Sequence, residues 1–179
     1  QERAKRQKEY WFEQFNGELP VLNLPLDYIR PVIQSFEGTT IPFKLEIPQT
    51  RQLNRIAIEN NATLFMVCFS LFHILLSRLS RQDDIIIGTP VAGRRHPELA
   101  NIIGMFINTL ALRNVSDESL TFIEFLNRIK TSTLNAFEKQ EYPFEDILDS
   151  VKVQRDTARN PLFDVMFALQ NMEAASDSD

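Results

Sequence analysis

Two polar side chains interrupt an apolar stretch in the segment formed by Phe106, Ile107, Asn108 and Thr109. This segment puts an amide and a hydroxyl inside a predicted hydrophobic strand. A buried polar group must find hydrogen-bond partners, because leaving it unpaired is costly. Taken alone, such a pair indicates a structural role more often than a functional one.

A second candidate segment, Gly88–Arg95, follows a predicted buried strand and contains two glycines. A phosphate-binding loop of the Walker type would need lysine in place of Arg94 and serine or threonine in place of Arg95, and Pro90 removes a backbone donor. The match to a nucleotide-binding loop is therefore poor. The segment is either a turn with two solvated arginines, or Thr89 and Arg94 border a channel mouth where cations meet a phosphate or an acidic partner.

A third candidate segment carries charges of both signs at Arg155, Asp156 and Arg159, followed by Asn160 and Pro161. By itself it could be a salt-bridged turn and nothing more. A residue before proline is biased to extended backbone, so Asn160 suits a chain that is entering a strand.

The two histidines and the single cysteine form no recognisable catalytic or metal-binding set. No HxxxH or CxxC spacing pairs them with another ligand, so no metal site is expected, and no Gly-x-Ser-x-Gly elbow is present. His73 lies on the polar stripe of an apolar helix, which favours a hydrogen-bonded structural histidine. His96 precedes Pro97 and is expected in an exposed turn. Cys68 is expected to be a buried, inert thiol.

The elements that must position these residues start with a helix. An amphipathic helix is predicted to end before Gly17, and a proline-rich, extended connector follows over residues 18–35. Alternation of apolar and polar residues over 36–47 predicts a strand. Pro48 then opens a helix that Asn60-Asn61 ends, and Thr63 caps a second helix that is apolar nearly all round.

The second half of the chain predicts strands and helices in alternation. The run Ile85-Ile86-Ile87 indicates a strand covered on both faces, and residues 107–113 and 163–169 are further strand candidates. A long amphipathic helix is predicted over 119–139, and Pro143 suits the first turn of the next helix. The fold class is therefore α/β: a mixed sheet flanked by helices. We expect an entry helix over 1–17, the connector over 18–35, an α/β lobe over 36–170 and a frayed acidic tail over 171–179.

Composition limits the classes of partner. An apolar fraction of 44% argues against disorder, and a net charge of −5 gives no general attraction to nucleic acid. The longest apolar run, residues 64–76, is too short for a membrane span. A single cysteine fits a reducing compartment, and no signal peptide is recognised, so we expect a cytoplasmic location without nucleic-acid or membrane partners.

Three strings, in this order and at these separations, resemble late motifs of the condensation domains of nonribosomal peptide synthetases. They are Ile-Gly-x-Phe-x-Asn-Thr at 103–109, the Tyr142, Pro143, Phe144 and Glu145 string, and Arg-Asp-x-x-Arg-Asn-Pro-Leu at 155–162. The segments 10–31 and 88–94 are similar to this family as well. The family's earlier motif, His-His-x-x-x-Asp-Gly, does not occur in the sequence. The chain therefore resembles the C-terminal lobe of such a domain, with a chloramphenicol-acetyltransferase-like fold.

The resemblance implies a site shared between two lobes. Carrier proteins would bring donor and acceptor on phosphopantetheine arms into a tunnel between the lobes, where the acceptor amine attacks the donor thioester. This chain would bind no cofactor itself. Its partners would be the N-terminal lobe of the same condensation domain, the donor and acceptor carrier proteins and an adjacent adenylation domain.

The resemblance also implies roles for the three segments. Residues 106–109 would line the tunnel, with Asn108 closest to the chemistry, and Thr89, Arg94 and Arg95 would form the acceptor-side rim. The turn at 155–162 would hold the last strands of the lobe. Asn108→Ala in an intact domain is expected to lower turnover and leave the fold intact.

Two functional interpretations stay open. The chain is half of a peptide-bond-forming site, or it is a non-catalytic lobe that docks carrier proteins or scaffolds a neighbour. A free-standing acyltransferase that uses coenzyme A shares the fold, but the long match at 155–162 disfavours it. Without the His-His motif, the isolated chain is expected to be catalytically inert. Its exposed apolar surface is expected to favour self-association.

Overall fold

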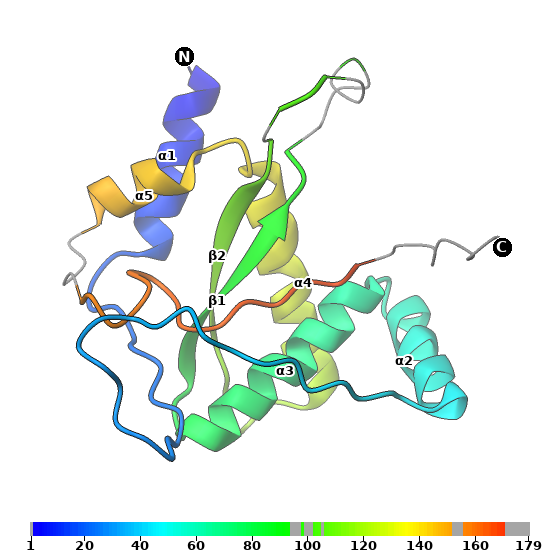
Figure 1. The fold of residues 1–179 in the computed structure, drawn as a ribbon. Coiled ribbons are helices and arrows are strands. Elements are labelled where there is room, and N and C mark those ends of the chain that lie inside the picture. Colours follow the sequence, from blue (N-terminus) through cyan, green and yellow to red (C-terminus); the bar gives the residue numbers. More distant parts are fainter. Residues whose placement is uncertain (1, 94–97, 99–101, 105, 152–155, 171–179) are drawn as a thin grey trace, which may run out of the picture.

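The structure is a computed structural model that describes residues 2–93, 98, 102–104, 106–151 and 156–170. In chain order the described elements are α1 (Glu2–Gln14), α2 (Ile47–Glu59), α3 (Leu64–Ser80), β1 (Asp84–Val91), β2 (Asn108–Val115), α4 (Phe122–Glu138) and α5 (Phe144–Ser150) (Figure 1).

The sheet is built on an antiparallel hairpin. β1 pairs with β2 from Asp84 opposite Val115 to Val91 opposite Asn108. On the other edge of β1, Gly88 forms a parallel bridge with Met166 through two backbone bonds, Gly88 N to Val165 O at 3.0 Å and Phe167 N to Gly88 O at 2.8 Å. The strand predicted over 163–169 is thus realised only as this bridge. A small mixed sheet flanked by helices confirms the predicted fold class.

Helices cover both faces of the hairpin. Successive side chains of a strand point to opposite faces. On β2, the Asn114 side chain meets Ser132 of α4, whereas the Arg113 side chain reaches the carbonyl of Gln14 in α1. The helix α3 packs beside α4, and α5 packs beside α1. The continuous apolar run of β1 is accordingly 1%, 3% and 0% exposed at Ile85, Ile86 and Ile87, which confirms a strand covered on both faces.

Local signals set the helix ends as the sequence predicts. Pro48 lies in the first turn of α2, and the helix gives way at Asn60. The Thr63 hydroxyl accepts a hydrogen bond from the Met66 amide at 3.3 Å, which satisfies one of the free donors at the start of α3. α4 begins at Phe122, later than the predicted residue 119, because Thr121 caps it in a reciprocal capping box with Glu124.

The predicted strand over 36–47 is wrong. Residues 36–46 have no regular structure, Phe36 and Phe43 are 95% and 84% exposed, and α2 already begins at Ile47. Alternation yields a strand only where a neighbouring strand supplies hydrogen-bond partners. In the described part of the chain, no backbone hydrogen bond joins residues 36–45 to another segment.

Taken singly, none of the described helices is long and apolar enough to cross a membrane, although α2 and α3 meet the criteria as a pair bent by 109°.

Candidate functional site

Two of the predicted site segments meet at the open end of the hairpin. The register places Thr89 opposite Leu110, Pro90 opposite Thr109 and Val91 opposite Asn108. Thr89 is only 2% exposed, so its hydroxyl lies inside the lobe and does not form a rim at the surface of this chain. Ile107, in contrast, is 67% exposed. Arg94 and Arg95 lie outside the described residues.

The two arms of the hairpin stay in close contact beyond the paired strands. Gly93 has φ of +64°, and a Cβ built on it would lie 1.8 Å from the backbone oxygen of Phe106. Only glycine tolerates this combination of backbone angle and proximity. Gly93 therefore keeps one arm of the hairpin against the backbone of Phe106.

Asn108 connects this hairpin to the helices behind it. Its Nδ2 donates to the carbonyl oxygens of Gln140 at 2.8 Å and Tyr142 at 2.9 Å. Its Oδ1 accepts from the amides of Thr109 at 2.9 Å and Phe144 at 3.3 Å. The two segments quoted as separate motifs, 103–109 and 142–145, are thus held together by one side chain.

The Tyr142, Pro143, Phe144 and Glu145 segment forms the entry to α5. Pro143 occupies the cap position, and Glu145 in the first turn complements the positive end of the helix. The Phe144 ring lies 5.7 Å from that of Phe163, so this turn also contacts the segment bridged to β1. Burial raises the pKa of the Tyr142 phenol, and the nearby Asp146 carboxylate adds to that rise, so the side chain is neutral near pH 7.

The third predicted segment ties the proline-rich connector to the rest of the molecule. The Thr157 hydroxyl donates to the Val32 carbonyl at 2.6 Å, and the Gln34 amide donates to the Thr157 carbonyl at 3.0 Å. Arg159 donates to the Leu22 carbonyl at 2.9 Å. The turn therefore fastens the connector at Leu22 and again at residues 32–34.

An ion-pair cluster accompanies that turn. Arg159 reaches the Asp164 carboxylate at 2.7 Å, and Arg30 lies 3.7 Å from the same carboxylate, whereas the Asp156 carboxylate is 4.0 Å from Arg159. The Asp164 side chain is 10% exposed. Its ion pair with Arg159 therefore matters most of the three for stability, because a buried carboxylate left without a partner is costly. Arg155, predicted in the same cluster, lies outside the described residues. Asn160 and Pro161 line a groove of about 780 Å³ beside this cluster.

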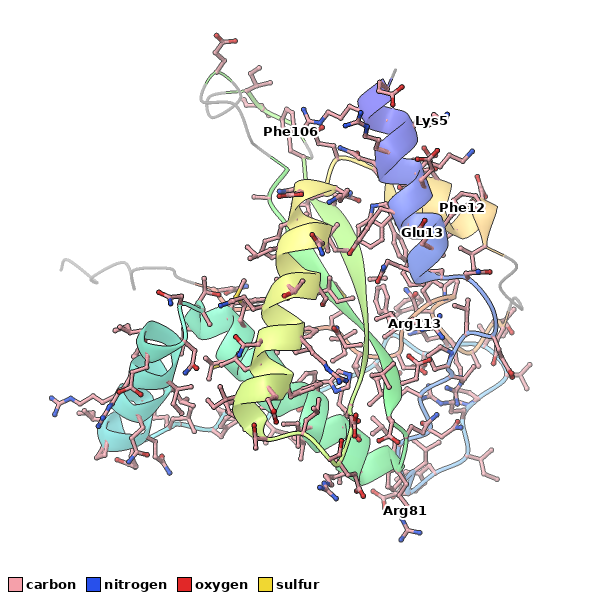
Figure 2. The ribbon with its side chains drawn as sticks, turned by 180° about the vertical axis from the view of Figure 1, so that it is seen from behind. Lys5, Phe12, Glu13, Arg81, Phe106 and Arg113 are labelled. Atoms are coloured by element: carbon pink, nitrogen blue, oxygen red, sulfur yellow. The ribbon has the colours of Figure 1, made fainter. Side chains whose placement is uncertain are left out.

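Sequence reasoning missed the contacts of Arg113. Its guanidinium binds both oxygens of Asp84, at 2.6 Å and 3.0 Å, and donates to the carbonyls of Gln14, Asn16 and Glu18 (Figure 2). The end of α1 and the start of the connector are therefore fixed to the sheet by one planar, five-donor group. The only sign of these contacts in the sequence was an arginine inside an apolar strand.

The remaining reactive residue types are structural. The His73 side chain is 0% exposed, and its Nε2 lies 3.0 Å from the Asn114 carbonyl oxygen, as predicted for a structural histidine. Burial lowers the pKa of His73, so the ring is neutral near pH 7. Cys68 was predicted to be a buried, inert thiol; it is half-buried, and this partial burial raises the pKa of the thiol. His96 lies outside the described residues.

The described residues contain neither a metal-ligand cluster nor an accessible histidine. They contain no group of three or more His, Cys, Asp or Glu side chains that could hold a metal ion. The one histidine among them is buried in the core. The hydrogen bonds of Asn108 join the open end of the hairpin to residues 140–144, and those of Arg113, Thr157 and Arg159 fix the connector.

Comparisons with known proteins agree with this architecture. The Condensation domain family model matches residues 1–179. Surfactin synthase subunit 1 of Bacillus subtilis (strain 168) is 50% identical over 167 residues, which cover 93% of this chain and 5% of that protein. Tyrocidine synthase 2 of Brevibacillus parabrevis is 49% identical over 170 residues, covering 95% of this chain and 5% of that protein.

Solved structures show the same fold. A four-domain nonribosomal peptide synthetase bound to AMP and glycine superposes with a TM-score of 0.91 at 28% identity, covering 94% of this chain and 13% of that one. The condensation domain of the Monacolin K polyketide synthase superposes with a TM-score of 0.70 at 20% identity, covering 92% of this chain and 41% of that one. The chain thus spans 5% of each of the two synthases, 13% of the four-domain synthetase and 41% of the polyketide synthase condensation domain. Because the family model matches its whole length, the chain belongs to the condensation-domain family of nonribosomal peptide synthetases.

Proposed function

We propose that this chain is the C-terminal half of a condensation site that forms an amide bond between two carrier-bound substrates. The observation that carries the proposal is the match of the condensation-domain family to residues 1–179, together with the meeting of its separate motif segments at Asn108. Relatives at about half identity are named as surfactin and tyrocidine synthases, which supports peptide synthesis.

The reaction would proceed by acyl transfer. The amine of the acceptor aminoacyl thioester attacks the carbonyl carbon of the donor thioester, and the tetrahedral intermediate collapses with loss of the donor thiol. One C–N bond forms, one C–S bond breaks, and the proton of the amine ends on the thiol. The protein must orient the amine and exclude water from the site. Both substrates would arrive on phosphopantetheine arms of carrier proteins.

This half would contribute structure to the site. The hairpin base at Phe106, Ile107, Asn108 and Thr109 would form tunnel wall, and the loop with Arg94 and Arg95 would face the acceptor side. The N-terminal lobe would supply the His-His motif that this sequence does not contain. The isolated chain would therefore be inert. An adjacent adenylation domain would activate the amino acid that the acceptor carrier protein brings.

The chain's exposed apolar residues support a partner lobe. Ile29, Phe36 and Ile103 are 98%, 95% and 102% exposed, and a partner that covered them would remove this apolar surface from water. The solved condensation domain noted above is also longer than this chain, which covers 41% of it. The rest of such a domain is the first candidate to cover these residues.

A docking or scaffold lobe is the second candidate function. It is favoured by the burial of His73, the one histidine in the described part of the chain. An assay on the intact synthetase that contains this chain distinguishes a condensation site from a docking lobe. With loaded donor and acceptor carrier proteins, a condensing enzyme gives dipeptidyl thioester by mass spectrometry, and alanine at the second histidine of the upstream motif abolishes it. Carrier-protein binding without product would identify a docking lobe.

A further inference from the structure

We infer that Asn108 is a positioning residue that locks the open end of the β1–β2 hairpin to the entry of α5. This inference rests on the proposed function only where it concerns turnover. Its structural part stands on the four hydrogen bonds of the side chain.

The hydrogen-bonding capacity of the Asn108 amide is completely used. A primary amide has two N–H donors and an oxygen with two lone pairs. The donors go to the carbonyls of Gln140 and Tyr142, at 2.8 Å and 2.9 Å. The oxygen accepts from the amides of Thr109 and Phe144, at 2.9 Å and 3.3 Å. A bond from this amide to a reacting atom would therefore require the loss of one of these four.

All four partners are backbone groups. Two of them, the carbonyls of Gln140 and Tyr142, belong to the turn between α4 and α5, and a third, the Phe144 amide, belongs to the first residue of α5. The same turn is held from a second direction, since the Trp11 indole N–H of α1 donates to the Lys139 carbonyl at 3.1 Å. Trp11 is 1% exposed and belongs to the main core. Trp11 thus holds the turn to the core, and Asn108 holds the end of the hairpin to the turn.

The hairpin is where this position matters. Asn108 pairs with Val91 as the last register pair at this end of the hairpin. Two residues further, Gly93 lies against the Phe106 backbone. A shift of Asn108 would therefore move both arms together. Catalytic geometry is sensitive to such movements, because a displacement of about 1 Å can cost about a hundredfold in rate.

Asn108→Asp is the diagnostic variant because it changes almost no atoms. Its ionised carboxylate would place a negative oxygen against the carbonyl oxygens of Gln140 and Tyr142, which repel it. Its protonated form can donate to one of them, so the variant should recover as pH falls. The ionisable neighbours in the turn and in α5 are identical in wild type and variant, and they are Lys139, Glu141, Tyr142, Glu145, Asp146 and Asp149.

The test uses the intact synthetase with wild type, Asn108→Ala, Asn108→Asp and Asn127→Ala. Asn127 is an exposed α4 residue whose side chain makes no hydrogen bond to the described residues. The readouts are hydrogen exchange at the Phe144 amide, the melting temperature between about pH 8 and pH 5, and kcat and KM for the acceptor.

We expect Asn108→Ala to speed exchange at Phe144 by at least about tenfold and to lower kcat in parallel, with Asn127→Ala like wild type. Asn108→Asp should regain melting temperature and kcat toward wild type as pH falls. A large loss of kcat with unchanged exchange and melting temperature would instead identify a direct catalytic contact. Unchanged exchange and unchanged kcat would overturn the inference entirely. If wild type makes no product, the proposed function fails, while the exchange and melting measurements still decide the structural part.

Discussion

Arg113 shows at the residue scale why a charged side chain stands in an otherwise apolar strand. Its side chain is 18% exposed, and it binds Asp84 and three carbonyls of residues 14–18. Lysine would keep the charge but lose the planar fork that reaches these acceptors at once. Arg113→Lys should therefore lower the free energy of unfolding by about 2 kcal/mol, measured by urea denaturation.

The matched control for that prediction is Arg55→Lys. Arg55 pairs with Glu59 at 2.7 Å on the exposed face of α2, and such pairs contribute little to stability. We expect no measurable change there. Equal urea midpoints for Arg113→Lys and wild type would show that the Arg113 contacts do not stabilise the fold.

His73 gives the fold a specific pH dependence. Burial lowers the pKa of the folded His73, partly offset by its bond to Asn114 and by Asp84 and Asp83, whereas the unfolded ring titrates near about 6.5. The unfolded state therefore binds the proton first, and the stability that His73 contributes is lost as pH falls from about 6.5 toward the folded pKa.

The variant His73→Gln lacks this titration. Its deficit in unfolding free energy relative to wild type should be largest near about pH 8 and should shrink below about pH 6.5, by at most about 1.4 kcal/mol per pH unit. Chemical denaturation across this pH range measures it. His96 is common to both proteins. Parallel stability curves for the two proteins would contradict a depressed pKa at His73.

At the residue scale, the sequence pointed to candidate segments, but it did not predict the hydrogen-bond partners of their side chains. The position of Asn108 in an apolar strand was visible, but its partners are carbonyls of residues 140 and 142, which no local pattern indicates. The contact of Thr157 with Val32 spans 125 positions and was equally hidden. Hydrogen bonds between distant segments depend on the assembled fold.

At the scale of elements, helices were predicted well because their signals are local. Thr63, Pro48 and the spacing of apolar residues define α2, α3 and α4 within one or two turns of each end. Strands depend on neighbours instead. The alternation at 36–47 was as clear as that of a real strand, and it forms none because no partner lies beside it in the described residues.

The segment after Phe163 joins the sheet through a single close approach at Gly88. A Cβ at Gly88 would lie 2.6–2.9 Å from three ring atoms of Phe163. Gly88→Ala should therefore displace this segment and destabilise the fold by about 1–3 kcal/mol. Hydrogen exchange at the Phe167 amide, which donates to the Gly88 carbonyl at 2.8 Å, should accelerate.

A double mutant tests the cause of that effect. Adding Phe163→Leu makes room for the methyl group, so Gly88→Ala should cost less in this background than alone. Gly38→Ala serves as control, because a Cβ at Gly38 meets no atom within 4 Å. Strict additivity of Gly88→Ala and Phe163→Leu would exclude the steric explanation.

At the scale of the whole molecule, a well-formed core coexists with a large exposed apolar surface. The core residues Trp11, Phe69 and Leu110 are 0–1% exposed, whereas Tyr28 and Ile29 of the connector and Phe36 directly after it are 88–98% exposed. The family and fold class were predictable, because the motif strings and their order lie in the sequence. What covers the exposed surface stays a prediction that rests on the resemblance.

The most direct test of the central claim is reconstitution of the site from two halves. This chain is co-expressed with an N-terminal lobe that carries the His-His motif, mixed with loaded donor and acceptor carrier proteins, and dipeptidyl thioester is followed by mass spectrometry. We predict product only when both halves are present. Stable association of the two halves without any product, or product from this chain alone, would contradict the claim that it is half of a condensation site.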